Sequence, residues 1–171
     1  MINLVKDTID NKDIDQLIDW LKTYPKLTKG PRTLELEDKW SDWLGVKYSV
    51  FCNSGSSANL LMLSALKESG YMENNKVVVP SVAWSTDLAP VIQLGMKPIL
   101  CDSNMEDLSV DLEHLERIFK EENPSALMFV SVLGLVPNMK KVLDLCTKYS
   151  VYLLEDTCES MGCQYKDKKL V

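Results

Sequence analysis

The sequence predicts an α/β domain of three layers, in which helices cover both faces of a parallel sheet. From Tyr48 onward, short apolar runs alternate with helical segments, and such alternation is typical of parallel strands joined by right-handed crossovers. The run Val151–Leu154 is continuously apolar, as expected of a strand buried on both faces. Small polar or acidic residues follow several of the runs, at the strand ends where ligands bind in open α/β sheets.

Five runs are predicted to be strands and four segments to be helices between them. The predicted strands are Tyr48–Cys52, Lys76–Val79, Lys97–Cys101, Ala126–Leu133 and Val151–Leu154. The predicted helices are Ser56–Ser69, Thr86–Leu94, Leu112–Glu121 and Met139–Tyr149. Two amphipathic helices precede them, one over Asp13–Thr23 and one from Leu34 to a stop at Gly45. We therefore expect an N-terminal helical segment, residues 1–45, followed by a sheet domain, residues 46–171.

The amino-acid composition and net charge argue against several classes of function. A chain of 171 residues with 46% hydrophobic and 26% charged residues is typical of a soluble protein with one substantial core. The net charge of −6 argues against nucleic acid or an anionic membrane as partner, and no apolar run is long enough to span a bilayer. Five cysteines without scaffold spacing favour reduced thiols in a cytoplasmic protein. A single histidine, His114, and no Cys-x2-Cys pair argue against a zinc site.

Two acids, Glu155 and Asp156, follow the last apolar run. Asp156 is therefore predicted to be a carboxylate at the rim of an apolar core, where an unpaired charge is costly. It could cap the next turn, a common role for Asp after a strand. Alternatively, it could pair with the protonated ring nitrogen of a pyridine cofactor and so keep the ring an electron sink. Taken alone, the segment favours the cap.

The first predicted strand leads into the turn Asn53-Ser54-Gly55-Ser56-Ser57-Ala58-Asn59. The small residues Gly55, Ser56 and Ser57 let backbone N–H groups approach a ligand, and a helix N-terminus favours an anion such as phosphate. The turn has neither the G-x-x-x-x-G-K-[ST] nor the G-x-G-x-x-G pattern, which argues against a nucleoside triphosphate or a dinucleotide. A plain Ser N-cap explains the same residues equally well.

Trp84 lies in the segment Val79–Asp87, after the second predicted strand. An aromatic ring in a strand-exit loop can offer its face to a flat ligand, although such residues usually pack under the loop. A phosphate-binding turn, an aromatic face and a carboxylate would all lie at the carboxyl ends of strands. Together they would suit the phosphate, the ring face and the ring nitrogen of pyridoxal 5'-phosphate (PLP).

Residues from about Thr28 to Leu170 resemble the N-terminal half of the large domain of the DegT/StrS family. Members of this family are PLP-dependent enzymes that modify nucleotide-linked sugars. The resemblance implies a PLP-dependent transferase fold (aspartate aminotransferase-like, fold type I), with the large domain incomplete at its C-terminal end and the small C-terminal domain absent. The matching strings, in order, are Asn53-Ser54-Gly55-Ser56-Ser57-Ala58-Asn59, Val79-Pro80-Ser81-Val82-Ala83-Trp84-Ser85-Thr86 and Leu154-Glu155-Asp156-Thr157-Cys158-Glu159-Ser160-Met161-Gly162.

The resemblance also assigns cofactor-binding roles to individual residues. These are Gly55, Ser56 and Ser57 for the phosphate, Trp84 for the ring face, Asp156 for the ring nitrogen and Glu159 for the hydroxyl side of the ring. Glu159 departs from the Gln or His of most aminotransferases in the family. It is more similar to the branch of 4-keto-6-deoxy-hexose 3-dehydratases, which replaces the Schiff-base lysine by histidine and uses pyridoxamine 5'-phosphate (PMP).

The resemblance implies an aminotransferase of cell-surface polysaccharide biosynthesis. Its substrates would be a nucleotide-linked 4-keto-6-deoxy sugar and an amino donor such as glutamate, and the complete protein would be a homodimer. Two alternatives stay open: a sugar 3-dehydratase, and a non-catalytic module that binds cofactor weakly or associates with a full-length homologue. The catalytic Lys or His would lie beyond Val171, so we expect the 171 residues alone to catalyse neither reaction.

Overall fold

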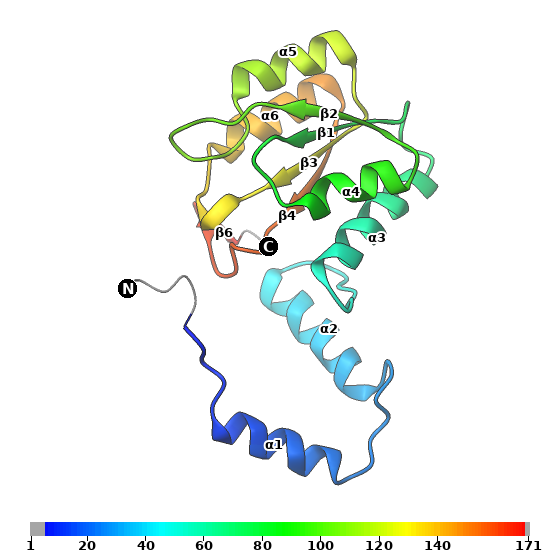
Figure 1. The fold of residues 1–171 in the computed structure, drawn as a ribbon, viewed down its shortest axis with the longest axis vertical. Coiled ribbons are helices and arrows are strands. Elements are labelled where there is room, and N and C mark those ends of the chain that lie inside the picture. The colour runs from blue at the N-terminus through cyan, green and yellow to red at the C-terminus, as the bar shows by residue number, and fades with distance from the viewer. Residues whose placement is uncertain (1–5, 170–171) are drawn as a thin grey trace. The chain divides into compact units, whose positions relative to one another are not determined.

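The computed structural model describes residues 6–169, and its contacts divide the chain into two units between Phe51 and Cys52. The first unit contains the helices α1 (Asn11–Leu21) and α2 (Pro31–Leu44), and the second contains the sheet and its helices (Figure 1). No helix among the described residues is long and apolar enough to cross a membrane.

Local sequence signals explain the two helices of the first unit. The Asp10 side chain accepts hydrogen bonds from the backbone N–H groups of Lys12 and Asp13, and the Asp13 carboxylate accepts one from Asp10 N–H, which forms a capping box. Pro31 occupies the first turn of α2, and Gly45 ends this helix with a φ of +80°. Both predicted N-terminal helices are therefore confirmed.

The predicted strand Tyr48–Cys52 is wrong, because this segment belongs to no strand. The backbone N–H of Phe51 donates to Glu37 Oε1 of α2 at 2.9 Å, and Ser49 Oγ accepts from Ser41 Oγ at 2.8 Å. A strand exists only where its backbone groups pair with a neighbouring strand. The segment is instead a connection that forms hydrogen bonds with the side chains of Ser41 and Glu37 in α2.

The sheet of the second unit is parallel, with the strand order β2-β1-β3-β4. Its strands are β1 (Lys76–Pro80), β2 (Lys97–Cys101), β3 (Ala126–Val130) and β4 (Tyr152–Asp156). Its helices are α3 (Gly55–Glu68), α4 (Ser85–Gln93), α5 (Leu112–Glu122) and α6 (Met139–Tyr149). A 3-10 turn η1 (Val132–Gly134) follows β3, and a hairpin of β5 (Gln164–Tyr165) and β6 (Lys168–Lys169) follows β4.

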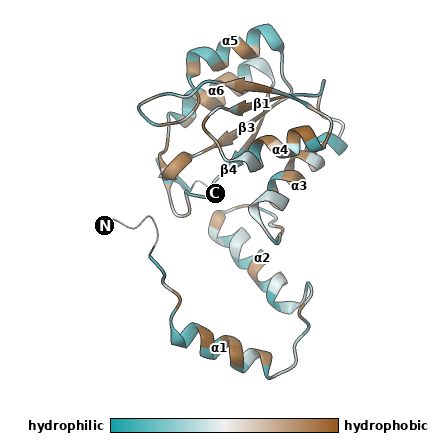
Figure 2. Ribbon diagram, viewed as in Figure 1, coloured by the Kyte–Doolittle hydropathy of each residue, from teal (hydrophilic) through white to brown (hydrophobic). Residues whose placement is uncertain are grey.

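The central strands β1 and β3 are hydrophobic along their length (Figure 2), and they bury both of their faces, as their apolar sequences predict. Val78 and Leu127 point into the core with the buried residues of α5 and α6, such as Phe119. Val77 and Val79 belong to the second core, which includes Leu63 of α3. Successive side chains of a strand point to opposite faces, so one apolar run contributes to two cores. The result is the predicted three-layer α/β/α arrangement, with α3 and α4 opposite α5 and α6 (Figure 1).

The fourth predicted strand, Ala126–Leu133, ends earlier than expected, at Val130. Leu133 and Gly134 adopt left-handed φ angles of 54° and 72°, so the chain turns sharply after β3. The turn is held from the segment after β4, because Ser160 Oγ donates to Ser131 O at 2.9 Å and Leu133 N–H donates to Glu159 Oε2 at 2.6 Å. These tertiary contacts override the β-propensity of the apolar residues.

We expect Gly134→Ala to destabilise the protein more than Gly95→Ala does. Both glycines have left-handed φ angles, of 72° and 68°, so each substitution carries a strain of about 1–2 kcal/mol. A Cβ at Gly134 would also lie 3.1 Å from Glu159 O and 3.2 Å from Cys163 Sγ, whereas a Cβ at Gly95 meets nothing within 4 Å. We expect this close approach to add about 1–3 kcal/mol. Denaturant unfolding of the two variants measures the difference, and equal losses would contradict the tight packing after β3.

Candidate functional site

The candidate site lies at the carboxyl edge of the sheet. The chain runs from β1 outward to β2 and then returns to β3 on the other side of β1, so the strand order reverses between β1 and β3. In open α/β sheets, ligands bind outside the carboxyl ends of strands at such a point. The segments after β1 and β4, together with α3, bring polar side chains to this edge.

Asn59 of α3 connects these segments. Its side-chain amide donates to Asp156 Oδ2 at 2.6 Å and to Asp87 Oδ1 at 3.2 Å, and it lies 3.4 Å from the carbonyl oxygen of Thr86. Asn59 is 4% exposed and Asp87 is 1% exposed. One buried amide therefore bridges two carboxyl groups that are far apart in the sequence.

Asp156 is the last residue of β4 and is half-buried. Burial would raise the pKa of its carboxyl group, but hydrogen bonds from the Asn59 amide and from the backbone N–H of Cys158 outweigh this effect, and the pKa lies below its usual range. The Cys158 N–H reaches Asp156 Oδ1 at 2.9 Å, so each oxygen has one donor. Asp156 is therefore a fixed carboxylate that retains its negative charge at neutral pH.

Asp87 lies in the first turn of α4 and has the opposite character. Burial and then the negative charge of Asp156 raise the pKa of Asp87 to about 7, although the backbone N–H of Trp84 acts in the other direction. Its Oδ2 atom is buried and has no hydrogen-bond partner. The pair therefore carries one negative charge below neutral pH, and Asp156 carries that charge.

The predicted phosphate-binding turn forms the N-terminus of α3. Ser54 is the N-cap, and its Oγ accepts from the Ser57 N–H at 3.2 Å, so the predicted N-cap is present. The Ser57 N–H is thus occupied, whereas Gly55 and Ser56 are exposed and their N–H groups have no acceptor among residues 6–169. Free N–H groups at the start of a long helix are suited to an anion.

Trp84 is the residue before α4 and is 72% exposed. It lies three residues before Asp87, whose N–H donates to the Trp84 carbonyl at 3.0 Å. The ring therefore does not pack under the loop, which was the alternative for this residue, and it is free to contact a flat ligand.

Glu159 is exposed, and its Oε2 atom accepts the short hydrogen bond from Leu133 N–H. It is thus anchored to the turn after β3, whereas the hydrogen bonds described for Asp156 come from Asn59 and Cys158. Ser131, the first residue after β3, is 1% exposed, and its Oγ has no hydrogen-bond partner.

Asn59, Asp87 and Ser131 were not predicted as site residues. Asp87 Oδ2 and Ser131 Oγ are the buried side-chain atoms without a partner among the described residues, and both follow strands at the carboxyl edge. Such unpaired groups are rare in folded proteins and call for an explanation. An acid in the otherwise uncharged helix α4 was the available sequence signal for Asp87, whereas nothing in the pattern distinguished Ser131.

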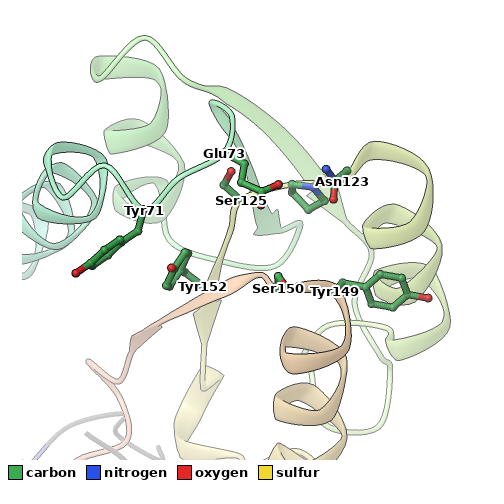
Figure 3. A pocket seen from close by; sticks show the side chains of 8 residues that line it. Tyr71, Glu73, Asn123, Ser125, Tyr149, Ser150 and Tyr152 are labelled. Carbon is green, nitrogen blue, oxygen red and sulfur yellow. The ribbon is translucent and has the colours of Figure 1, made fainter.

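A small pocket at the opposite, amino edge of the sheet differs from this site. It has a volume of about 80 Å³ and lies before β3 and β4, next to Tyr71 and Tyr152 (Figure 3). These two rings stack with centroids 6.3 Å apart. The pocket contains no carboxylate pair or helix N-terminus, so we place the candidate site at the carboxyl edge.

The residues at the carboxyl edge fit a phosphorylated pyridine. Free helical N–H groups suit the phosphate, the exposed Trp84 suits the ring face, and the ionised Asp156 suits a protonated ring nitrogen. No group of three or more His, Cys, Asp or Glu side chains in the described part of the chain could hold a metal ion.

Comparison with known proteins agrees with the resemblance seen in the sequence. The profile of the DegT/DnrJ/EryC1/StrS aminotransferase family matches residues 7–171. A GDP-4-keto-6-deoxy-D-mannose 3-dehydratase of Yersinia pseudotuberculosis is 32% identical, over 99% of this chain and 44% of that protein. A GDP-perosamine synthase of Caulobacter vibrioides is 26% identical, over 98% of this chain and 44% of that protein. The chain thus spans less than half the length of these relatives.

Solved structures show the same fold. The Escherichia coli GDP-4-keto-6-deoxy-D-mannose-3-dehydratase with bound hydrated PLP has a TM-score of 0.89 and 30% identity, covering 99% of this chain and 44% of that one. The Helicobacter pylori aminotransferase PseC is involved in the biosynthesis of pseudoaminic acid. Its structure has a TM-score of 0.85 and 25% identity, and the match covers 95% of this chain and 43% of PseC. The predicted fold type I architecture is confirmed.

We expect Asp87→Asn to remove a pH dependence of folding stability. The pKa of Asp87 rises from an ordinary 3.8 to about 7 in the folded chain, so its contribution to stability is present below pH 4 and is lost as the pH rises to about 7. Between pH 5 and pH 8 the wild-type free energy of unfolding should fall by about 2–3 kcal/mol relative to Asp87→Asn. Denaturant titrations at the two pH values measure this difference. Asp144→Asn, an exposed acid of α6, is the control, and parallel wild-type and Asp87→Asn curves would contradict the buried acid.

Proposed function

Because the chain belongs to the DegT/DnrJ/EryC1/StrS aminotransferase family, we propose that it binds PLP or PMP at the carboxyl edge of its sheet. The protein that carries it would act on nucleotide-linked 4-keto-6-deoxy sugars. The proposal depends on one observation: the ionised Asp156 is fixed by Asn59 of α3. The N-terminus of the same helix offers free N–H groups. When bound, the cofactor withdraws electrons from the reacting bonds of the substrate.

Each predicted site residue receives a definite task in this proposal. The N–H groups of Gly55 and Ser56, with the hydroxyl groups of Ser56 and Ser57, bind the phosphate. Trp84 covers a face of the ring. Asp156 holds a proton on the ring nitrogen, because a carboxylate with a lowered pKa stabilises an adjacent cation.

Glu159 is proposed to lie near the hydroxyl side of the ring. The hydrogen bond that it accepts from Leu133 N–H supports this role, because it fixes the carboxylate beside the turn after β3.

Two reactions are candidates for the complete protein. Amino transfer from a donor such as glutamate is the reaction suggested by the family and by relatives such as GDP-perosamine synthase. Removal of the 3-hydroxyl group is favoured by a specific observation: two relatives with 32% and 31% identity are GDP-4-keto-6-deoxy-D-mannose 3-dehydratases. Glu159 supports the same alternative, since its sequence context is more similar to that branch.

The setting of the protein completes the proposal. We propose a cytoplasmic homodimer that contributes to the biosynthesis of cell-surface polysaccharides.

Incubating the complete gene product with GDP-4-keto-6-deoxy-D-mannose, glutamate and PLP distinguishes the two reactions. A 4-amino sugar indicates amino transfer, whereas a 3-deoxy keto sugar indicates dehydration. PMP binding without either product would favour a non-catalytic module.

We expect Asp156→Asn to weaken PMP binding more than Glu159→Gln. A hydrogen bond between a carboxylate and a cationic ring nitrogen contributes about 1.5–3 kcal/mol, so Asp156→Asn should raise the dissociation constant by about 10-fold to 150-fold. Glu159→Gln removes the same charge but keeps an acceptor for Leu133 N–H, and its effect should be several-fold smaller. Fluorescence titration of the variants with PMP measures both. If Asp156→Asn bound PMP normally while Trp84→Ala did not, the ring-nitrogen role of Asp156 would be wrong.

A further inference from the structure

Asp87 is the least explained group at the candidate site. It is 1% exposed, its Oδ2 atom has no partner, and its Oδ1 atom receives the Asn59 amide at 3.2 Å. A buried carboxyl group with an unpaired oxygen is unfavourable as an anion. A role in the capping of α4 explains neither the burial nor the proximity to Asp156.

The contacts decide which of the two acids carries the proton. Asp156 receives the shorter Asn59 bond, at 2.6 Å, and the Cys158 N–H at 2.9 Å. Asp87 receives the longer bond from the same amide, at 3.2 Å, and the backbone N–H of Trp84 only partly offsets the effects of burial and of the Asp156 charge. The negative charge is therefore more stable on Asp156, and the two acids together bind one proton, on Asp87.

We propose, on the basis of the proposed cofactor site, that Asp87 is a positioning residue that holds this proton and exchanges it with solvent. While the edge is free and the pH is below 7, Asp87 is mostly a neutral acid, so Asn59 can bridge both groups without repulsion between two anions. When a cationic ring nitrogen is held at Asp156, Asp87 releases its proton to solvent and becomes a second anion near the cation. The exchange involves one proton and no other bond.

The electrostatic reason is that a cation at Asp156 offsets the charge that opposes the ionisation of Asp87. The negative charge of Asp156 is, after burial, the largest cause that raises the pKa of Asp87 to about 7. By linkage, a cation that lowers this pKa is bound more tightly as the pH rises toward 7.

Few other groups around Asp87 titrate in this range. It is the only titratable residue of α4, and Asn59, which faces it from α3, is neutral. Burial and then hydrogen bonding to Asp156 raise the pKa of Cys158 to about 12. The charged residues of β1 and β2, Lys76 and Lys97, lie at the amino edge and pair with Glu122. A proton released near pH 7 can therefore be attributed to Asp87 by substitution.

The test counts protons. PMP is titrated calorimetrically into the complete gene product at pH 7 in two buffers with different ionisation enthalpies, for the wild type, Asp87→Asn and the control Asp144→Asn. A group with a pKa of about 7 is about half protonated at that pH, so the wild type and the control should release up to about half a proton more than Asp87→Asn. Inorganic phosphate, which contacts no ring site, should release equal numbers from all three proteins.

The outcomes separate this inference from the proposed function. Equal proton counts for PMP in the wild type and in Asp87→Asn would overturn the role of Asp87 and leave the cofactor site intact. Absence of PMP binding to the wild type would overturn both. If Asp87→Asn binds PMP too weakly to titrate, Asp87→Ser, which also lacks a titrating group, replaces it in the comparison.

Discussion

The candidate site depends on the hydrogen bonds of one buried amide. Asn59 donates to Asp156 and Asp87, and without it two carboxyl groups would face each other at the edge of an apolar core. Burying such groups without donors is costly. The amide stabilises the anion on Asp156, while the proton on Asp87 keeps the total charge at one. Burial and the charge of Asp156 raise the pKa of Asp87, whereas bonds from Asn59 and Cys158 outweigh burial at Asp156. Two chemically identical side chains therefore have different protonation states, as environment produces in many active sites.

Helix α3 connects this charge arrangement to the proposed anion-binding end of the site. Gly55 begins the helix and Asn59 follows after about one turn, so their positions differ by about 6 Å along the axis. Ser54 caps the helix and leaves the N–H groups of Gly55 and Ser56 without acceptors in the described part of the chain. In the proposed site, this helix therefore sets the distance between the N–H groups for the phosphate and the carboxylate for the ring nitrogen. This helix packs against α4, which carries Asp87 and follows Trp84.

The segment after β4 determines the shape of the neighbouring edge. Glu159 and Ser160 bond to the turn after β3, at Leu133 N–H and Ser131 O. Gly134 approaches the same segment so closely that a Cβ there would lie 3.1 Å from Glu159 O. The short bond from Leu133 is charge-assisted and therefore stronger than a neutral one. Glu159 thus has a structural contact besides any contact with a ligand. A substitution of Glu159 is therefore expected to affect the turn after β3 as well as any contact with a ligand.

The sequence by itself determined the layered fold, most of its helices and strands, and the predicted site residues Trp84 and Asp156 at the carboxyl edge. Those features follow from local patterns: apolar runs that bury two faces, N-caps such as Ser54, and the stop at Gly45. Only the tertiary structure decided that Tyr48–Cys52 is not a strand, because its bonds go to side chains of α2. It also decided the end of β3 and the bridge from Asn59 to Asp87 and Asp156. Both depend on contacts between residues that are distant in the chain. A local sequence pattern does not determine which oxygen a buried amide will hydrogen-bond or which of two acids will keep its proton.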